Sequence, residues 1–453
     1  MSVTYSGEFG NAQAKGAAIN ARYMTLLYFV LTGYAVAGKG FAYVGIKPLF
    51  IGDVTMVIGI IVFLRTANLL DLLRDRLLLF IALYMAWGAW RTIPGLHFGM
   101  DALRDSVIWA YGSFAFIVAN ALASHEREPR RLIDYFQRLA YIAIWAFPVV
   151  FVCTQFLLPV LPQWPGTDVP IIFALFDQEM VHFVGLSVFL MGGVISLSPA
   201  YVVAIVMFAV ACAAELRAAA VGAMAALSLT AVLAPVRRHI MKAVLLLAAI
   251  IALLWITDAK VTLINRREIS VDAFVAQVTS ISEGFHFDLR HISREDRNSG
   301  SITWRLIFWA FLVDKVWTDA PVNGLGFGET LALKGLPFKV EEDRSPHNGT
   351  VTILARMGFV GLALWIAMLG VWFHGIISAQ LRAVRERRYI WASIFMALAA
   401  YVLASLACAS LGVFLEGPMG GIWFWCLIGM GAAMRRWYLA WPDYWTESEA
   451  ESA

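Results

Sequence analysis

The sequence predicts an all-α membrane protein with about twelve transmembrane helices. The 453-residue chain is 60% hydrophobic and only 15% charged. Apolar runs of about 17 to 25 residues, the length that crosses hydrocarbon, recur along it. Such runs must be helical, because backbone groups in lipid have to be paired within their own segment. The net charge of +3 is small for this length and gives no support to nucleic-acid binding.

Short polar segments separate the apolar runs, whose limits follow from hydropathy. The predicted spans are 23–45, 49–64, 77–93, 106–123, 139–161, 177–195, 199–215, 217–234, 241–257, 349–375, 389–412 and 418–434. Lysine and arginine concentrate in cytoplasmic loops, so the arginine-rich loops orient the chain. Twelve spans place these loops, and both termini, on the cytoplasmic side: 65–76, 127–138, 237–242, 382–388 and 435–436.

This topology divides the chain into four regions. They are an N-terminal bundle of about nine spans (1–257), a large outer loop with short helices (258–346), a C-terminal bundle of about three spans (347–438) and a cytoplasmic tail (439–453).

One apolar segment of the outer loop does not fit a further span. Residues 302–317, ITWRLIFWAFLVDKVW, are apolar enough to suggest one, but a crossing there would place the arginines of 382–388 outside. We therefore expect a non-spanning helix at the outer interface.

The most specific motif is SPHNGTVTILARMGFVG, from Ser345 to Gly361, at the entry to the tenth span. Ser345 suits an N-cap and Pro346 the first helical position, which places His347 in the first turn. A helix N-terminus favours a phosphate and disfavours imidazolium. A neutral imidazole is what a general base requires. The alternative is an interfacial histidine hydrogen-bonded to backbone carbonyls.

This motif resembles that of the O-antigen ligases, within the O-antigen ligase and polymerase family: His-Asn, nine residues, then Gly-x-x-Gly. His347, Asn348, Gly358 and Gly361 match it. The resemblance implies transfer of a polysaccharide from undecaprenyl diphosphate to lipid A-core, by a metal-independent inverting reaction. It also implies the Gram-negative inner membrane, with the active site on the periplasmic side. We expect the two glycines to let a neighbouring helix approach closely.

Two arginines resemble arginines of that family. Arg217 lies on the outer turn after the seventh span, although many relatives have Ser-Arg-Gly where this chain has Leu-Arg-Ala. It suits a bidentate diphosphate clamp; it could instead pair with Glu215 or extend to the interface. Arg305 follows the variable part of the outer loop, in an otherwise apolar helix. An unpaired guanidinium there would be costly, so a phosphate or carboxylate partner is expected.

Three further cations could bind substrate. Arg266 and Arg267 follow the ninth span, where they could bind the diphosphate or ordinary anionic headgroups. Lys39 interrupts the first span; intramembrane cations are functional candidates, but this one could extend to the outer headgroups.

Two other charged residues leave alternatives open. Glu416, on the outer turn before the last span, could orient His347, bind an acceptor hydroxyl, or be a structural carboxylate. Arg356 either pairs inside the bundle or lies before the membrane begins. The glycine-rich NGLGFGE, residues 323–329, lacks the strand and the Gly-Lys-Ser/Thr of a nucleotide loop, so it predicts a turn.

The resulting hypothesis assigns catalysis to His347 as the base, with Arg217 and Arg305 stabilising the diphosphate. The substrate-binding residues would be Asn348, Arg266, Arg267, Lys39 and Glu416. The outer face has no Asp-x-Asp or His/Asp cluster, so no metal and no cofactor are expected. The expected partners are the lipid-linked O-antigen, lipid A-core and membrane lipids. A polymerase, a protein oligosaccharyltransferase and a non-catalytic transporter remain alternatives, the last predicting midplane charges and inverted symmetry.

Overall fold

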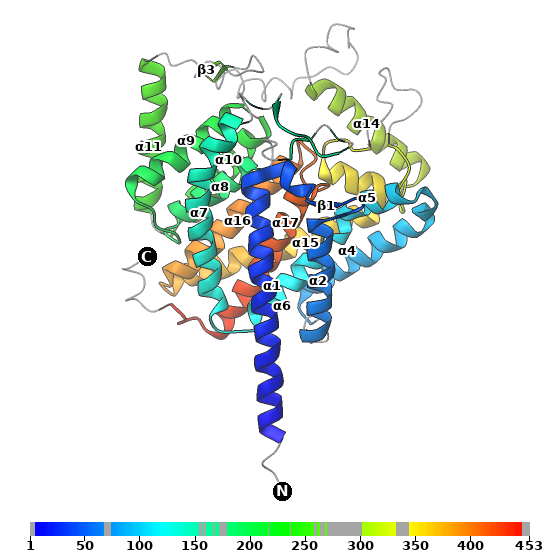
Figure 1. The fold of residues 1–453 in the computed structure, drawn as a ribbon, viewed down its shortest axis with the longest axis horizontal. Helices are drawn as coiled ribbons and strands as arrows, with labels where there is room; N and C mark the ends of the chain where they lie inside the picture. The colour runs from blue at the N-terminus through cyan, green and yellow to red at the C-terminus, as the bar shows by residue number, and fades with distance from the viewer. Residues whose placement is uncertain are drawn as a thin grey trace.

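The protein is built almost entirely from α-helices (Figure 1). The computed structural model describes residues 5–67, 74–153, 157, 160–165, 167, 169–171, 179–215, 217–235, 237–257, 261–262, 268–269, 301–331 and 344–445. Within these ranges, strands are limited to two short antiparallel ladders, β1 with β2 and β3 with β4. The predicted helical class is therefore confirmed.

The helices and strands follow the chain in this order. The first half contains α1 (Tyr5–Ala42), β1 (Gly45–Ile46), β2 (Leu49–Phe50), α2 (Ile51–Thr66), α4 (Arg76–Thr92), the 3-10 helix η1 (Ile93–Phe98), α5 (Met100–Ala110), α6 (Ser113–Ala123), α7 (Glu128–Val152) and α8 (Glu179–Met191). The second half contains α9 (Pro199–Glu215), α10 (Arg217–Leu233), α11 (Arg237–Ile256), β3 (Val261–Thr262), β4 (Glu268–Ile269), α14 (Ser301–Asp319), α15 (Gly349–Arg385), α16 (Tyr389–Ala409) and α17 (Pro418–Ala440).

Several of these helices are long and apolar enough to cross a membrane. Among the described residues four pass on length and composition, and the bent pair α5 and α6 would make a fifth. The four are Ala14–Ala42, Arg76–Phe98, Gly349–Arg385 and Tyr389–Ala409. Others are shorter than a full span, such as α2 with 16 residues and α9 with 17. The chain is a multi-pass membrane protein, and the number of twelve spans stays a prediction.

Some helix limits differ from the hydropathy reading. The predicted span 106–123 consists of two helices, α5 and α6, bent by 42°. Several helices extend beyond their apolar runs; for example, α1 begins at Tyr5, α7 begins at Glu128 and α15 continues to Arg385. The reason is that hydropathy detects only the apolar part of a helix, whereas backbone hydrogen bonding continues through charged turns.

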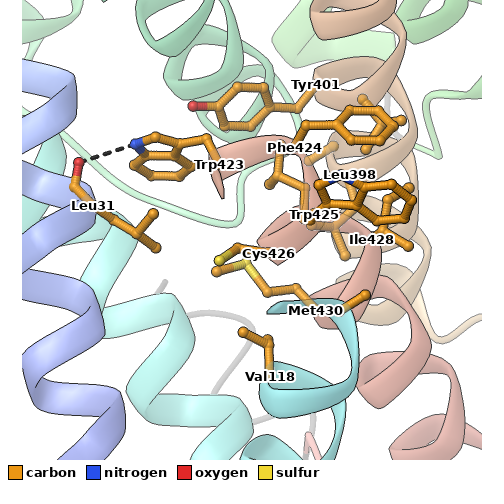
Figure 2. Close-up of a cluster of buried hydrophobic side chains, with 14 of the residues drawn as sticks. Leu31, Val118, Leu398, Tyr401, Trp423, Phe424, Trp425, Cys426, Ile428 and Met430 are labelled. Carbon is orange, nitrogen blue, oxygen red and sulfur yellow. Dashed lines mark hydrogen bonds between the residues drawn. The ribbon is translucent and has the colours of Figure 1, made fainter. Parts of the chain in front are cut away.

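The core is centred on α17, whose side chains are almost all buried between Met419 and Met434. Its glycines, tryptophans and proline lower its hydropathy, yet they suit close packing. Trp423 donates a 3.0 Å hydrogen bond to the carbonyl of Leu31 in α1 (Figure 2). A Cβ on Gly429 would lie 2.7 Å from the carbonyl oxygen of Ala115, so α6 approaches too closely for any side chain there.

Four helix ends meet around one turn, residues 410–417, which we call the α16–α17 turn. The end of α16 contacts the start of α10, where Cys408 Sγ donates to the carbonyl of Ala218 at 3.2 Å. The start of α15 also reaches the turn, because a Cβ on Gly349 would lie 3.0 Å from the side chain of Leu415. The N-termini of α10, α15 and α17 therefore share one end of the bundle, and this end carries the candidate site.

Candidate active site

The entry of α15 is capped by Asn348. Its Oδ1 accepts hydrogen bonds from the backbone N–H groups of Thr350 at 3.0 Å and Val351 at 3.1 Å. The prediction that Ser345 is the N-cap is therefore wrong. Asparagine caps a helix at least as well as serine, and the extended backbone at position 348 lets its side chain fold back onto the first turn. Because the cap occupies Oδ1, the amide N–H groups of Asn348 are the part that remains for a substrate.

His347 precedes this cap instead of lying in the first helical turn. Its φ is 54°, in the left-handed region, which costs a residue with a side chain about 1–2 kcal/mol. Two contacts hold the neighbouring backbone: Ser345 Oγ accepts from the His347 N–H at 3.1 Å, and Trp309 Nε1 donates to the Pro346 carbonyl at 2.6 Å. These two hydrogen bonds fix the backbone at His347, so its imidazole is attached immediately before the N-cap of α15.

Glu416 contacts this region from the α16–α17 turn. Its Oε1 lies 2.5 Å from Thr352 Oγ1, and the Ser345 side chain also hydrogen-bonds to it. Burial raises the pKa of Glu416, while hydrogen bonds from Ser345 and Thr352 and the positive charge of Arg356 partly oppose the rise. Glu416 is thus linked to the His347 backbone through Ser345, which fits the predicted orienting role and the structural role alike.

Arg305 contacts the same turn from α14. Its NH1 group donates to the carbonyl oxygen of Leu411 at 2.8 Å, so one acceptor is a backbone carbonyl and not the expected carboxylate. Trp309, one helical turn further on, reaches Pro346. A helix was predicted at 302–317, and α14 confirms it; its position at the outer interface stays a prediction. Helix α14 therefore links the α16–α17 turn to the histidine.

The remaining predicted residues are placed less completely. Arg217 is the first residue of α10; its backbone lies beside the end of α16, and its side chain is outside the described part. Arg266 and Arg267 lie outside the described residues. Lys39 is exposed in the last turn of α1, just after a break at Gly38. Trp164 donates to the carbonyl of the next residue, Gly40, at 3.0 Å, so this end of α1 contacts the segment around Trp164.

A buried charge network, missed by sequence reasoning, lies beside the histidine. The Arg356 side chain is 1% exposed and pairs with Asp105 at 2.9 Å. It therefore pairs inside the bundle, while the point at which the membrane begins stays a prediction. Arg344, three residues before His347, contacts Asp105 at 2.8 Å and Asp101 at 3.1 Å. The signal in the sequence was the four-residue spacing of Asp101 and Asp105. This spacing places both carboxylates on one face of a helix, where cationic partners are expected.

A glycine-containing segment, residues 320–331, packs against a break in α15; we call it the glycine loop. The break is at Gly358, with φ 67° and ψ −168°. A break frees backbone groups that must find partners elsewhere. The loop and α4 supply them: Leu325 N to Ala355 O at 2.7 Å, Gly326 N to Arg356 O at 3.2 Å, Phe359 N to Pro321 O at 2.8 Å and Trp87 Nε1 to Met357 O at 2.9 Å.

The close approach at Gly358 is therefore made by a loop and not by a neighbouring helix. A Cβ there would lie 2.3 Å from the carbonyl oxygen of Val322. At Gly361 a Cβ would lie 2.2 Å from the side chain of Met357, a residue of the same helix. The expected helix–helix contact is wrong at Gly358, because the turn predicted at 323–329 folds back over α15 instead; at Gly361 it stays a prediction.

Comparison with known proteins agrees with the motif. Residues 202–366 match the family model described as O-antigen ligase. The matched segment includes the start of α10, all of α14 and the entry of α15, and thus Arg217, Arg305 and His347. No curated protein matches the chain.

Proposed function

We propose that the chain is an O-antigen ligase, a proposal supported by the match of residues 202–366 to the O-antigen ligase family model. It transfers the O-antigen polysaccharide from undecaprenyl diphosphate to lipid A-core. The reaction takes place at the periplasmic face of the inner membrane of a Gram-negative bacterium. It requires no metal and no cofactor, because the anomeric phosphate bond of the donor is already activated.

The reaction is a single displacement. A hydroxyl oxygen of lipid A-core attacks the anomeric carbon, and the bond from that carbon to the diphosphate oxygen breaks. The configuration at this carbon inverts, undecaprenyl diphosphate leaves, and the hydroxyl proton passes to His347. A positioned general base contributes about 10² to 10⁴ in rate.

The diphosphate is held by cations and by helix N-termini. Arg217 and Arg305 stabilise the negative charge that develops as the bond breaks, and a fixed donor of this kind contributes about 10² to 10³ in rate. Arg266, Arg267 and Lys39 hold the lipid-linked phosphates before reaction. Asn348 contributes its amide N–H groups, and Glu416 fixes the histidine backbone through Ser345.

The observation that carries this proposal is the convergence around the α16–α17 turn. The N-termini of α10, α15 and α17 lie at this end, where the positive ends of the helix dipoles favour an anionic ligand. His347 lies immediately before one of these N-termini, and Arg305 is bonded to the turn itself. A neutral base beside an anion-binding end is the chemistry that a displacement at a glycosyl diphosphate needs.

The test measures transfer by purified protein in the presence of a chelator. Undecaprenyl diphosphate-linked glycan and lipid A-core are supplied, and the glycan is followed to its carrier on a gel. His347→Ala is compared with wild type and with His374→Ala, which changes an exposed histidine farther along α15. We expect glycan on lipid A-core with wild type and His374→Ala, and none with His347→Ala.

Two other results would overturn the proposal. Longer chains that remain on undecaprenyl diphosphate would identify a polymerase. The absence of any covalent product from folded wild-type protein would favour a transporter.

A further inference from the structure

Asp105 lies at the centre of the charge network beside the histidine. Its carboxylate accepts hydrogen bonds from Arg344 Nε at 3.2 Å, from Arg344 NH2 at 2.8 Å and from the backbone N–H of Gly328 at 3.1 Å. It also pairs with Arg356 NH2 at 2.9 Å. One carboxylate therefore joins α5, the glycine loop, α15 and the segment that leads to His347.

We propose that Asp105 is a positioning residue for His347, acting through Arg344 and Arg356 on the backbone of residues 344–348. This inference rests on the proposed function, in which His347 is the base. Asp105 itself makes no contact with the reacting atoms in this proposal.

The first argument is the conformation of His347. A left-handed backbone at a residue with a side chain persists only where the surroundings over-determine it. On the downstream side, the Asn348 cap begins α15. On the upstream side, Arg344 is bonded to Asp105 and donates to the carbonyl of Gly328 at 2.6 Å. The strained residue therefore lies between two fixed points.

The second argument is that Asp105 connects those two points. Arg356 is part of α15, and besides the ion pair it donates to the carbonyls of Gly326 at 3.1 Å, Glu329 at 2.6 Å and Arg344 at 3.2 Å. The last of these bonds ties the helix directly to the residue that anchors the upstream side. Asp105 binds both arginines, so it sets the position of residue 344 relative to the helix that begins at residue 349.

The third argument is the local fit of the glycine loop. Gly328 has φ 95°, and a Cβ there would lie 2.7 Å from Phe98 Cβ. The Gly328 N–H donates to Asp105, and the Gly328 carbonyl accepts from Arg344. One glycine therefore hydrogen-bonds to both residues of the Asp105–Arg344 ion pair. The other aspartate, Asp101, is 53% exposed, and within the described part of the chain its ion pair is with Arg344, which makes it the weaker partner.

The test uses Arg344 as its main position, because Asp105→Asn leaves the buried Arg356 without its charge partner and could prevent folding. Arg344→Ala removes the upstream anchor, Arg344→Lys keeps the charge without the bidentate geometry, and Asp101→Asn is the matched control. Each variant is assayed for kcat and KM with the lipid-linked donor. Hydrogen exchange of the backbone amides at 345–351 is measured in parallel.

We expect Arg344→Ala to lower kcat by about tenfold to a hundredfold, because a displacement of about 1 Å can cost a hundredfold, and to leave KM within about twofold. Arg344→Lys should recover part of kcat, and Asp101→Asn should stay close to wild type. Exchange at 345–351 should accelerate in Arg344→Ala while α16 and α17 remain protected.

Wild-type kcat and wild-type exchange in Arg344→Ala would overturn the proposal, as would a loss confined to KM. If wild-type protein forms no product at all, the proposed function fails. Exchange at 345–351 then still decides whether the network holds this backbone.

Discussion

Thr352 Oγ1 lies 2.5 Å from Glu416 Oε1 and 3.1 Å from the carbonyl oxygen of Asn348. Thr352 is the donor in both contacts, so its single hydrogen is shared between the Glu416 carboxylate and the helix carbonyl. The shorter contact joins the α16–α17 turn to the first turn of α15, and burial there raises the pKa of Glu416.

The first prediction concerns Glu416→Gln and pH. Because the pKa of Glu416 is raised in the folded protein, its protonated form is favoured there, and stability falls as pH rises above the ordinary value of 4.5. The glutamine side chain would keep an amide oxygen that accepts from Thr352 and Ser345 without the buried charge. The variant should therefore melt at a higher temperature than wild type at pH 7, and the difference should shrink toward pH 4.5.

Melting curves of both proteins in the same detergent, recorded across this pH range, test the prediction. A melting-temperature difference that is independent of pH would contradict it.

The second prediction concerns the break in α15. In Gly358→Ala the backbone conformation alone, with positive φ and ψ near 180°, should cost about 1–3 kcal/mol, because essentially only glycine adopts it. The new methyl would also lie 2.3 Å from the carbonyl of Val322, which should displace the glycine loop and lower transfer activity. Gly370→Ala, in the same helix, is the control, because a Cβ there meets nothing within 4 Å. Gly358→Ala should have a lower melting temperature and a lower transfer rate than Gly370→Ala. Similar values for the two variants would contradict a requirement for glycine at position 358.

The third prediction separates the two roles of Asn348. Asn348→Ala should lose about 0.5–2 kcal/mol of stability, as N-cap removal does. Asn348→Asp keeps an acceptor for the cap but lacks the amide N–H groups, so it should retain stability and lose activity if those groups bind substrate. Melting temperature and initial rate are measured for both variants. Full activity in Asn348→Asp would restrict this residue to capping.

The fourth prediction concerns Arg305. Arg305→Ala should lower kcat by about 10² to 10³, since it removes a fixed cation from the leaving diphosphate. Arg305→Lys should fall between Ala and wild type, because lysine keeps the charge but cannot form the bidentate contact. Lys315→Ala, a cation change on the same helix, should be nearly neutral. Steady-state kinetics with the lipid-linked donor decide this, and equal effects of the two alanine changes would refute a specific role.

Much of the architecture and part of the site could be predicted from local patterns. Apolar runs identified the helical segments, because hydrocarbon requires both apolar side chains and paired backbone groups. The motif at His347 and Asn348 located the entry of α15 to within a few residues. The cap was misplaced by three residues, since Ser345 and Asn348 are both good caps and only the course of the preceding backbone selects between them.

The sequence by itself determined that this protein is helical and membrane-spanning and which residue types gather near its histidine. Only the tertiary structure decided how that histidine is held. Asp105 and Arg344 are separated by 239 positions. No helical or strand periodicity in the sequence relates the glycine loop to the residues of α15 that it contacts. The physical reason is that hydropathy and capping are local properties of the chain, whereas ion pairs and the partners of a broken helix depend on which distant segments the fold brings within hydrogen-bonding distance.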